Sequence, residues 1–79
     1  KGLRWRGIAL RRLGRLEEAI RDLREAARVD RNDRDCGRHL FLALVGAGHR
    51  EEALKLLATY PELREHTSPE VRAALEKIK

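Results

Sequence analysis

One stretch of this sequence occurs twice, at a separation of 34 residues. The run Gly-Arg-Leu-Glu-Glu-Ala-Ile at 14–20 returns as Gly-His-Arg-Glu-Glu-Ala-Leu at 48–54. The correspondence extends beyond both ends of this run at the same offset, for example with Leu23 over Leu57. Because the register is kept over a whole repeat, the chain is predicted to consist of tandem copies of one supersecondary unit that stack on each other.

Apolar residues recur at helical spacing through both copies, so each copy is predicted to form a pair of helices. Gly14 follows the first periodic segment and suits the left-handed conformation that ends a helix. Asp33 or Asp35 is the expected N-cap of the third helix, while Thr67 and Glu70 have the spacing of a capping box before the last one. The expected helices span about 2–13, 16–29, 35–47, 50–59 and 68–79.

The first helix is expected to bury a single apolar arc. The residues assigned to this arc are Leu3, Trp5, Ala9, Leu10 and Leu13. The last helix has an apolar stripe that includes Val71 and Ile78, with charged residues on the opposite side. This pattern is typical of an amphipathic helix that lies on the surface of a helical core.

These residues resemble the tetratricopeptide repeat, a family built from a 34-residue helix-turn-helix unit. In the first copy, Gly7 and Leu10 match the family's first helix, Gly14 matches its turn, and Ala19 and Leu23 match its second helix. The resemblance implies an all-α fold. It further implies a right-handed α-solenoid of two antiparallel helix pairs plus a C-terminal capping helix.

On this basis the chain is expected to be a single tetratricopeptide-like domain over 1–79, with repeats at about 1–33 and 34–66 and a last helix at about 68–79. The capping helix would cover the apolar flank that the last repeat exposes. The alternative is that this helix begins a third, truncated repeat. Two and a half repeats fall short of the roughly three that independent stability usually requires, so a neighbour is expected.

The positive charge of the chain is concentrated in its first part. The formal net charge is +5, and residues 1–34 carry eleven Lys or Arg against six Asp or Glu, whereas residues 35–79 carry seven of each. Arg is suited to carboxylates and phosphates because its planar guanidinium can form two parallel hydrogen bonds. The first helix is therefore a candidate anion-binding element, and the alternative is an ordinary solvated face.

The family resemblance implies a protein-interaction scaffold in which the first helix of each pair lines a concave groove. Such a groove would be basic with an apolar floor and would bind an acidic peptide or partner helix. The residues that the resemblance places in this groove are Lys1, Arg4, Ile8, Arg11, Arg12, Arg38, Leu42 and Arg72.

Other interpretations remain open at this stage. The high content of Arg would also fit a helical repeat that binds nucleic acid, although the second half of the chain has no net charge. The chain could instead be a regulatory or oligomerisation module of a larger protein. Self-association through exposed ends of the repeat stack is a further possibility.

No pattern of catalytic residues is found, so the chain is not expected to be an enzyme and no cofactor or metal is expected. Cys36 and His39 lie three residues apart, but two ligands do not make a metal site, and both are interpreted as packing or surface residues. No apolar run approaches the length of a membrane span, and no signal-peptide pattern precedes the first helix. The lone cysteine fits a reducing compartment, and a cytoplasmic location is expected.

Overall fold

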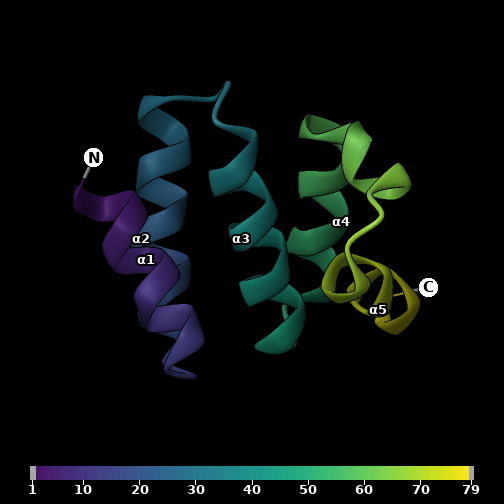
Figure 1. The fold of residues 1–79 in the computed structure, drawn as a ribbon, viewed down its shortest axis with the longest axis horizontal. Helices are drawn as coiled ribbons and strands as arrows, with labels where there is room; N and C mark the ends of the chain where they lie inside the picture. Colours follow the sequence, from purple (N-terminus) through teal and green to yellow (C-terminus); the bar gives the residue numbers. More distant parts are fainter. Residues whose placement is uncertain (1, 79) are drawn as a thin grey trace.

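All the regular secondary structure of the protein is helical over residues 2–78, the part of the chain that this computed structural model describes. Figure 1 shows the first four helices side by side, each running opposite to the one before it. The all-α helical-repeat fold that the sequence predicts is confirmed. The elements are α1 (Gly2–Arg12), α2 (Leu16–Val29), α3 (Arg34–Gly46), α4 (Arg50–Thr59), the 3₁₀ helix η1 (Pro61–Glu65) and α5 (Pro69–Lys77).

The two turns within the helix pairs have the same geometry. Gly14 and Gly48 both have a φ of 85°, the left-handed conformation that costs glycine little. After each of these glycines, the next backbone amide donates back to the helix that has just ended. Arg15 donates to the Leu10 carbonyl at 2.9 Å, and His49 donates to the Leu44 carbonyl at 2.8 Å. The sequence repeat therefore corresponds to a repeated backbone geometry at the two turns. The left-handed conformation predicted for Gly14 is confirmed.

The helices of the first pair approach each other closely at Gly7. A Cβ atom on Gly7 would lie only 2.6 Å from Cγ of Leu23, so the position has room for glycine alone. Residues of α2 that face this contact, including Ala19 and Leu23, are fully buried. The turn into the next pair ends at Asp33, which is the N-cap of α3 and accepts a hydrogen bond from the Cys36 amide at 3.0 Å. Of the two caps that the sequence allowed, Asp33 is the one formed.

The start of α5 differs from the sequence prediction. Ser68, not Thr67, is the N-cap residue, and its side chain makes no capping hydrogen bond. The capping box predicted for Thr67 and Glu70 is therefore wrong, because Thr67 lies one residue too early. The segment is held by His66 instead, whose Nδ1 accepts a hydrogen bond from the Ser68 amide at 3.1 Å.

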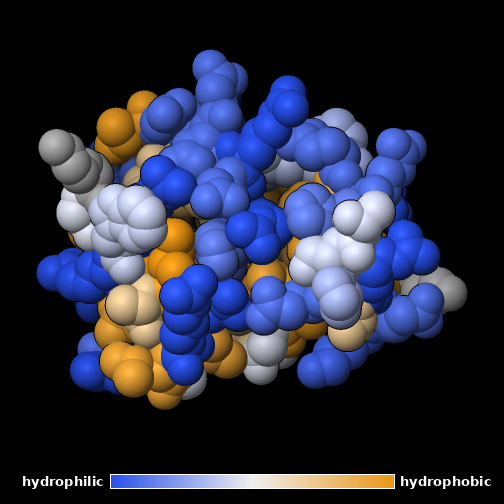
Figure 2. Space-filling model, viewed as in Figure 1, coloured by the Kyte–Doolittle hydropathy of each residue, from blue (hydrophilic) through white to orange (hydrophobic). Residues whose placement is uncertain are grey.

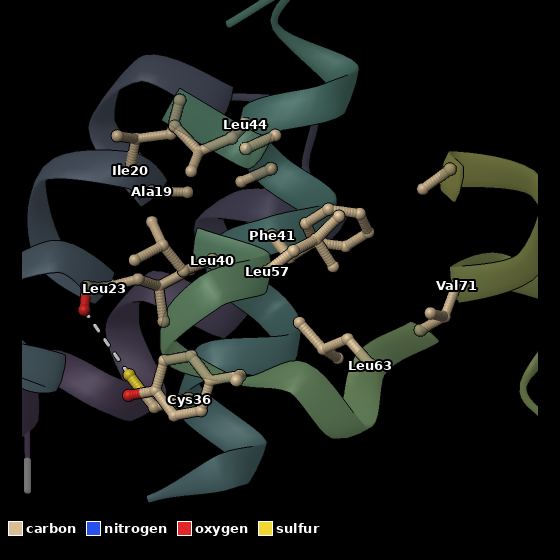
Figure 3. Close-up of a cluster of buried hydrophobic side chains, with 14 of the residues drawn as sticks. Ala19, Ile20, Leu23, Cys36, Leu40, Phe41, Leu44, Leu57, Leu63 and Val71 are labelled. Atoms are coloured by element: carbon tan, nitrogen blue, oxygen red, sulfur yellow. Dashed lines mark hydrogen bonds between the residues drawn. The ribbon is translucent and has the colours of Figure 1, made fainter. Parts of the chain in front are cut away.

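A continuous hydrophobic core connects α2 with α5 (Figure 3). Its largest fully buried side chains are Phe41, Leu23, Leu44, Leu57, Val71 and Cys36. α5 packs against α3 and η1, and Figure 1 shows it nearly end-on, so it crosses the direction shared by the first four helices. Val71, Ala74 and Ile78 bury the apolar stripe predicted for this helix.

Candidate functional site

Polar contacts join α1, α3 and α5 along one side of the molecule. Arg4 of α1 donates to Asp35 of α3 at 3.0 Å. Further along α1, Arg11 donates from Nε to Nδ1 of His39 at 3.2 Å, and its guanidinium lies 3.9 Å from the carboxylate of Glu70 in α5. These three helices therefore share a surface, which we call the α1–α3–α5 face. The resemblance to the tetratricopeptide repeat implied a groove lined by the first helix of each pair.

Arg4 is held by intramolecular contacts. Its guanidinium lies within ion-pair distance of both Asp33 and Asp35, and it stacks 4.9 Å from the centre of the Trp5 ring. Asp35 also accepts from Arg38 at 2.9 Å. The hydrogen bond from Arg38, together with the one from Arg4, holds the pKa of Asp35 below its ordinary value. Asp35 therefore holds two of the predicted groove cations, Arg4 and Arg38, in place.

Arg11 is the most buried of the predicted groove cations, with 15% of its side chain exposed. Its hydrogen bond requires an unprotonated Nδ1 on His39, a residue that is only 5% exposed. Burial lowers the pKa of His39 to about 4, and the nearby charges of Arg11 and Arg38 act in the same direction. A neutral imidazole thus links α3 to α1.

The remaining predicted site residues occupy different environments. Ile8 is buried, Leu42 is half-buried, and Arg12 and Arg72 are exposed and form no ion pair with any other described residue. Lys1 lies outside the described residues. A hollow of about 490 Å³ opens beside α1 and α3, with Ile8 in its lining and Arg12 and Arg38 among the cations around it.

The same hollow is lined by Trp5, Ala9 and Leu13, which the sequence analysis assigned to a buried arc. That assignment is wrong for all three. Trp5 is 61% exposed, Leu13 is 72% exposed, and Ala9 is also exposed. At 100° per residue they lie about 120–160° around the helix from Gly7, the residue in contact with α2. The position of Gly7 could therefore have shown that they face away from the core.

Cys36 and His39 do not form a reactive pair. Cys36 is buried, and its Sγ lies 3.4 Å from the Leu23 carbonyl oxygen. Burial raises the pKa of its thiol to about 11, so the thiol stays protonated at neutral pH. Within residues 2–78, no three His, Cys, Asp or Glu side chains are grouped so that they could hold a metal ion. In the same part of the chain, no helix is both long enough and apolar enough to cross a membrane.

Paired antiparallel helices, matched turns and a shared face on the first helices define an α-helical repeat protein. The family model described as a tetratricopeptide repeat matches residues 10–78. The chain belongs to the tetratricopeptide repeat family, as its sequence indicated, and repeats of this family are generally protein-protein interaction modules. A search of the curated proteins found no match. A search of the solved structures also found none.

Proposed function

We propose that this protein binds an acidic peptide or partner helix on the α1–α3–α5 face. The observation that carries the proposal is the hollow beside α1, which is lined both by the exposed ring of Trp5 and by Arg12, a cation that pairs with no other described residue. An apolar surface with a few cations around it suits a ligand that has both hydrophobic and carboxylate side chains. Arg72 of α5 lines a different hollow, together with Leu54 of α4 and Arg64 of η1, so it is not part of this one.

The cations of this face have two different roles in the proposal. Arg4 and Arg11 are engaged by Asp35, His39 and Glu70, so they set the shape of the surface and contribute mainly to its field. Arg12 forms no ion pair with any other described residue, so it is available to pair with a carboxylate of a ligand. Electrostatic pairs of this exposed kind affect the rate and selectivity of association more than the final affinity.

The proposal can be tested by titrating the protein with a fluorescently labelled peptide of Leu and Glu residues and recording anisotropy. Arg12→Glu should weaken binding about fivefold or less at low salt, because an exposed ion pair contributes about 1 kcal/mol or less, whereas Arg72→Glu, in the other hollow, should have little effect. Lys55→Glu is the matched control, since Lys55 is exposed on α4, away from this face. Equal losses in all three variants would show that only net charge matters.

A parallel titration with random single-stranded RNA and duplex DNA separates this proposal from nucleic-acid binding. At about 150 mM salt we expect no saturable binding to either, because most cations of α1 are already paired within the protein. Micromolar binding to nucleic acid that is lost in Arg12→Glu would reassign the α1–α3–α5 face to that ligand.

A further inference from the structure

An apolar stripe runs along α1 on the side that faces away from α2. It consists of Trp5, Ala9 and Leu13, spaced four residues apart, and we refer to it as the α1 stripe. Figure 2 shows a hydrophobic patch in this region, on a surface that is otherwise mainly hydrophilic. Trp5 is 61% exposed and Leu13 is 72% exposed on the same face of α1. Two large exposed apolar side chains on one helix face favour an interaction surface over a face that only contacts solvent.

The internal repeat shows what an equivalent face does elsewhere in the protein. At an offset of 34 residues, the α1 stripe corresponds to His39, Ala43 and Ala47 of α3. His39 is 5% exposed and Ala43 is fully buried, because α3 packs against the first helix pair on this side. The same side of the repeat unit is therefore covered by helices in the second copy and uncovered in the first.

The first copy of the repeat differs from the second in ways that favour the binding of a partner at the α1 stripe. At one neighbouring position, Arg6 replaces the buried Leu40 and pairs with Asp22 at 2.6 Å, as expected where a helix meets water. The α1 stripe shows the opposite trend, because Trp5 and Leu13 are larger and more apolar than their counterparts His39 and Ala47. A face that only had to be soluble would not gain hydrophobic area in this way.

The charges around the stripe determine which occupant fits. α1 has no acidic residue in its first turn and none elsewhere in its sequence, and Arg6 and Arg12 lie on either side of the stripe. In a second copy docked antiparallel about Ala9, Arg6 would be on the same side of the seam as Arg6 of the other chain, and Arg12 on the same side as its own counterpart, so both edges would bring like charges together and oppose self-association. A helix with carboxylates beside its apolar seam would instead pair with Arg12.

We infer that the α1 stripe is the docking site for an amphipathic helix of a partner protein, whose apolar seam is flanked by Asp or Glu. The inference rests on the proposed function and specifies both the element that is bound and the form of the ligand. The small side chain of Ala9 lets the partner helix approach closely, while Trp5 and Leu13 pack on either side of it. This is recognition of a helix by its apolar face, with anchors spaced by one turn.

The probe follows from the helix that covers the equivalent face of α3. A stapled peptide with the sequence of residues 16–29 of this chain, carrying the changes R21E, R24E and R28E, keeps the apolar seam of α2 and removes its exposed cations. Stapling is needed because an isolated helix of this length is marginal in water. Trp5 is the only tryptophan of the chain, so its emission reports directly on coverage of the stripe.

We expect the probe to cause a saturable blue shift of Trp5 emission. Ala9→Arg should weaken binding by about tenfold or more, equivalent to at least about 1.4 kcal/mol, because it places a bulky charge in the centre of the seam. Ala58→Arg is the matched control, since Ala58 is also exposed within a helix, and it should leave binding unchanged. Arg12→Glu should weaken the binding of the acidic probe more than it weakens the binding of a stapled peptide with the unmodified 16–29 sequence.

Several outcomes would overturn the inference. The absence of a blue shift, or equal losses in Ala9→Arg and Ala58→Arg, would show that the stripe is not the site. Concentration-dependent dimerisation that Ala9→Arg abolishes would assign the stripe to a second copy of the chain. If Ala9→Arg has no effect while Arg12→Glu weakens acidic-peptide binding, the proposed function stands and the inference fails. If neither change weakens binding, both fail.

Discussion

The packing of α1 against α2 depends on a single missing side chain. At Gly7, an added Cβ would lie 2.6 and 2.8 Å from the Cγ and Cδ2 atoms of Leu23 and 3.3 Å from its backbone nitrogen. Leu23 is itself fully buried, so it has no space into which it can move. We predict that Gly7→Ala lowers the free energy of unfolding by about 1–3 kcal/mol, measured by urea denaturation.

Gly2→Ala provides the control for this prediction. Gly2 is in the same helix but has nothing within 4 Å of the added Cβ atom, so the change should have little effect or be slightly stabilising. Equal destabilisation in both variants would mean that the backbone of α1, and not the contact with Leu23, causes the loss.

A second prediction at the scale of one residue concerns His39 and acid. Its pKa is about 4 in the folded protein and 6.5 in a free imidazole, so from pH 6.5 downward the unfolded chain takes up a proton that the folded protein excludes. The free energy of unfolding should therefore decrease as the pH falls from 6.5 towards 4.5. In the folded protein the charged groups closest to this imidazole are Arg11, Arg38 and Asp35.

His39→Gln separates this effect from other acid effects, because glutamine can still accept a hydrogen bond from Arg11 but does not titrate in this range. Its stability should be nearly independent of pH between 6.5 and 4.5, as followed by circular dichroism during urea titration. Below that range the lowered pKa values of Asp22, Glu25 and Asp35 make both proteins less stable as these carboxylates lose their charge. Parallel pH profiles for the two proteins above pH 4.5 would contradict the assignment to His39.

Among the helices, α3 and α5 differ in how they begin. The side chain of Asp33 caps α3, whereas Ser68 occupies the N-cap position of α5 without a side-chain hydrogen bond. We predict that Asp33→Ala lowers the free energy of unfolding by about 0.5–2 kcal/mol and that Ser68→Ala changes it little, as measured by thermal and urea denaturation.

Asp33 also lies 3.4 Å from Nε of Arg4, so a second variant is needed to identify the cause. Asp33→Asn retains a capping oxygen but removes the negative charge. It should keep most of the stability that Asp33→Ala loses. If both variants lose the same amount, the ion pair with Arg4 contributes more than the cap.

Element boundaries were predictable from sequence where one residue dominates the local geometry. Gly14 and Gly48 end their helices in the left-handed conformation, and Pro61 begins a 3₁₀ helix where α4 stops. Thr67 misled because two adjacent residues, Thr67 and Ser68, can both act as caps, and it is the amide of Ser68 that is held by the side chain of His66, two residues earlier. Two neighbouring candidates leave the helix boundary uncertain by one residue.

Over the whole molecule, the sequence predicted which helices form the α1–α3–α5 face better than which side chains are available on it. The charge of α1 was evident, but the partners Asp35, His39 and Glu70 come from two other helices and are brought to Arg4 and Arg11 only by folding. Trp5 and Leu13 were assigned to the core because apolar residues at helical spacing are usually buried. In an open stack of repeats, the outer side of the first helix has the same pattern, and no other described helix covers it.

Because one core connects α2 with α5, we expect the protein to unfold in a single transition. Val71 lies near the C-terminal end of this core and is fully buried against it. Val71→Ala removes two methyl groups and leaves a small cavity, so it should lower the free energy of unfolding by about 2 kcal/mol.

The loss should appear as an equal shift of the urea midpoint by two probes, the far-ultraviolet circular dichroism of all helices and the near-ultraviolet signal of buried Tyr60. Tyr60 packs beside Gly37 of α3, whereas Val71 is in α5. The signal of Tyr60 therefore reports on a different part of the core. If the core is continuous, a defect in α5 is transmitted to α3 and to the first helix pair as well. A variant in which part of the helical signal melts early, while the rest keeps its original midpoint, would show that α5 is an appendage that folds separately from the stack.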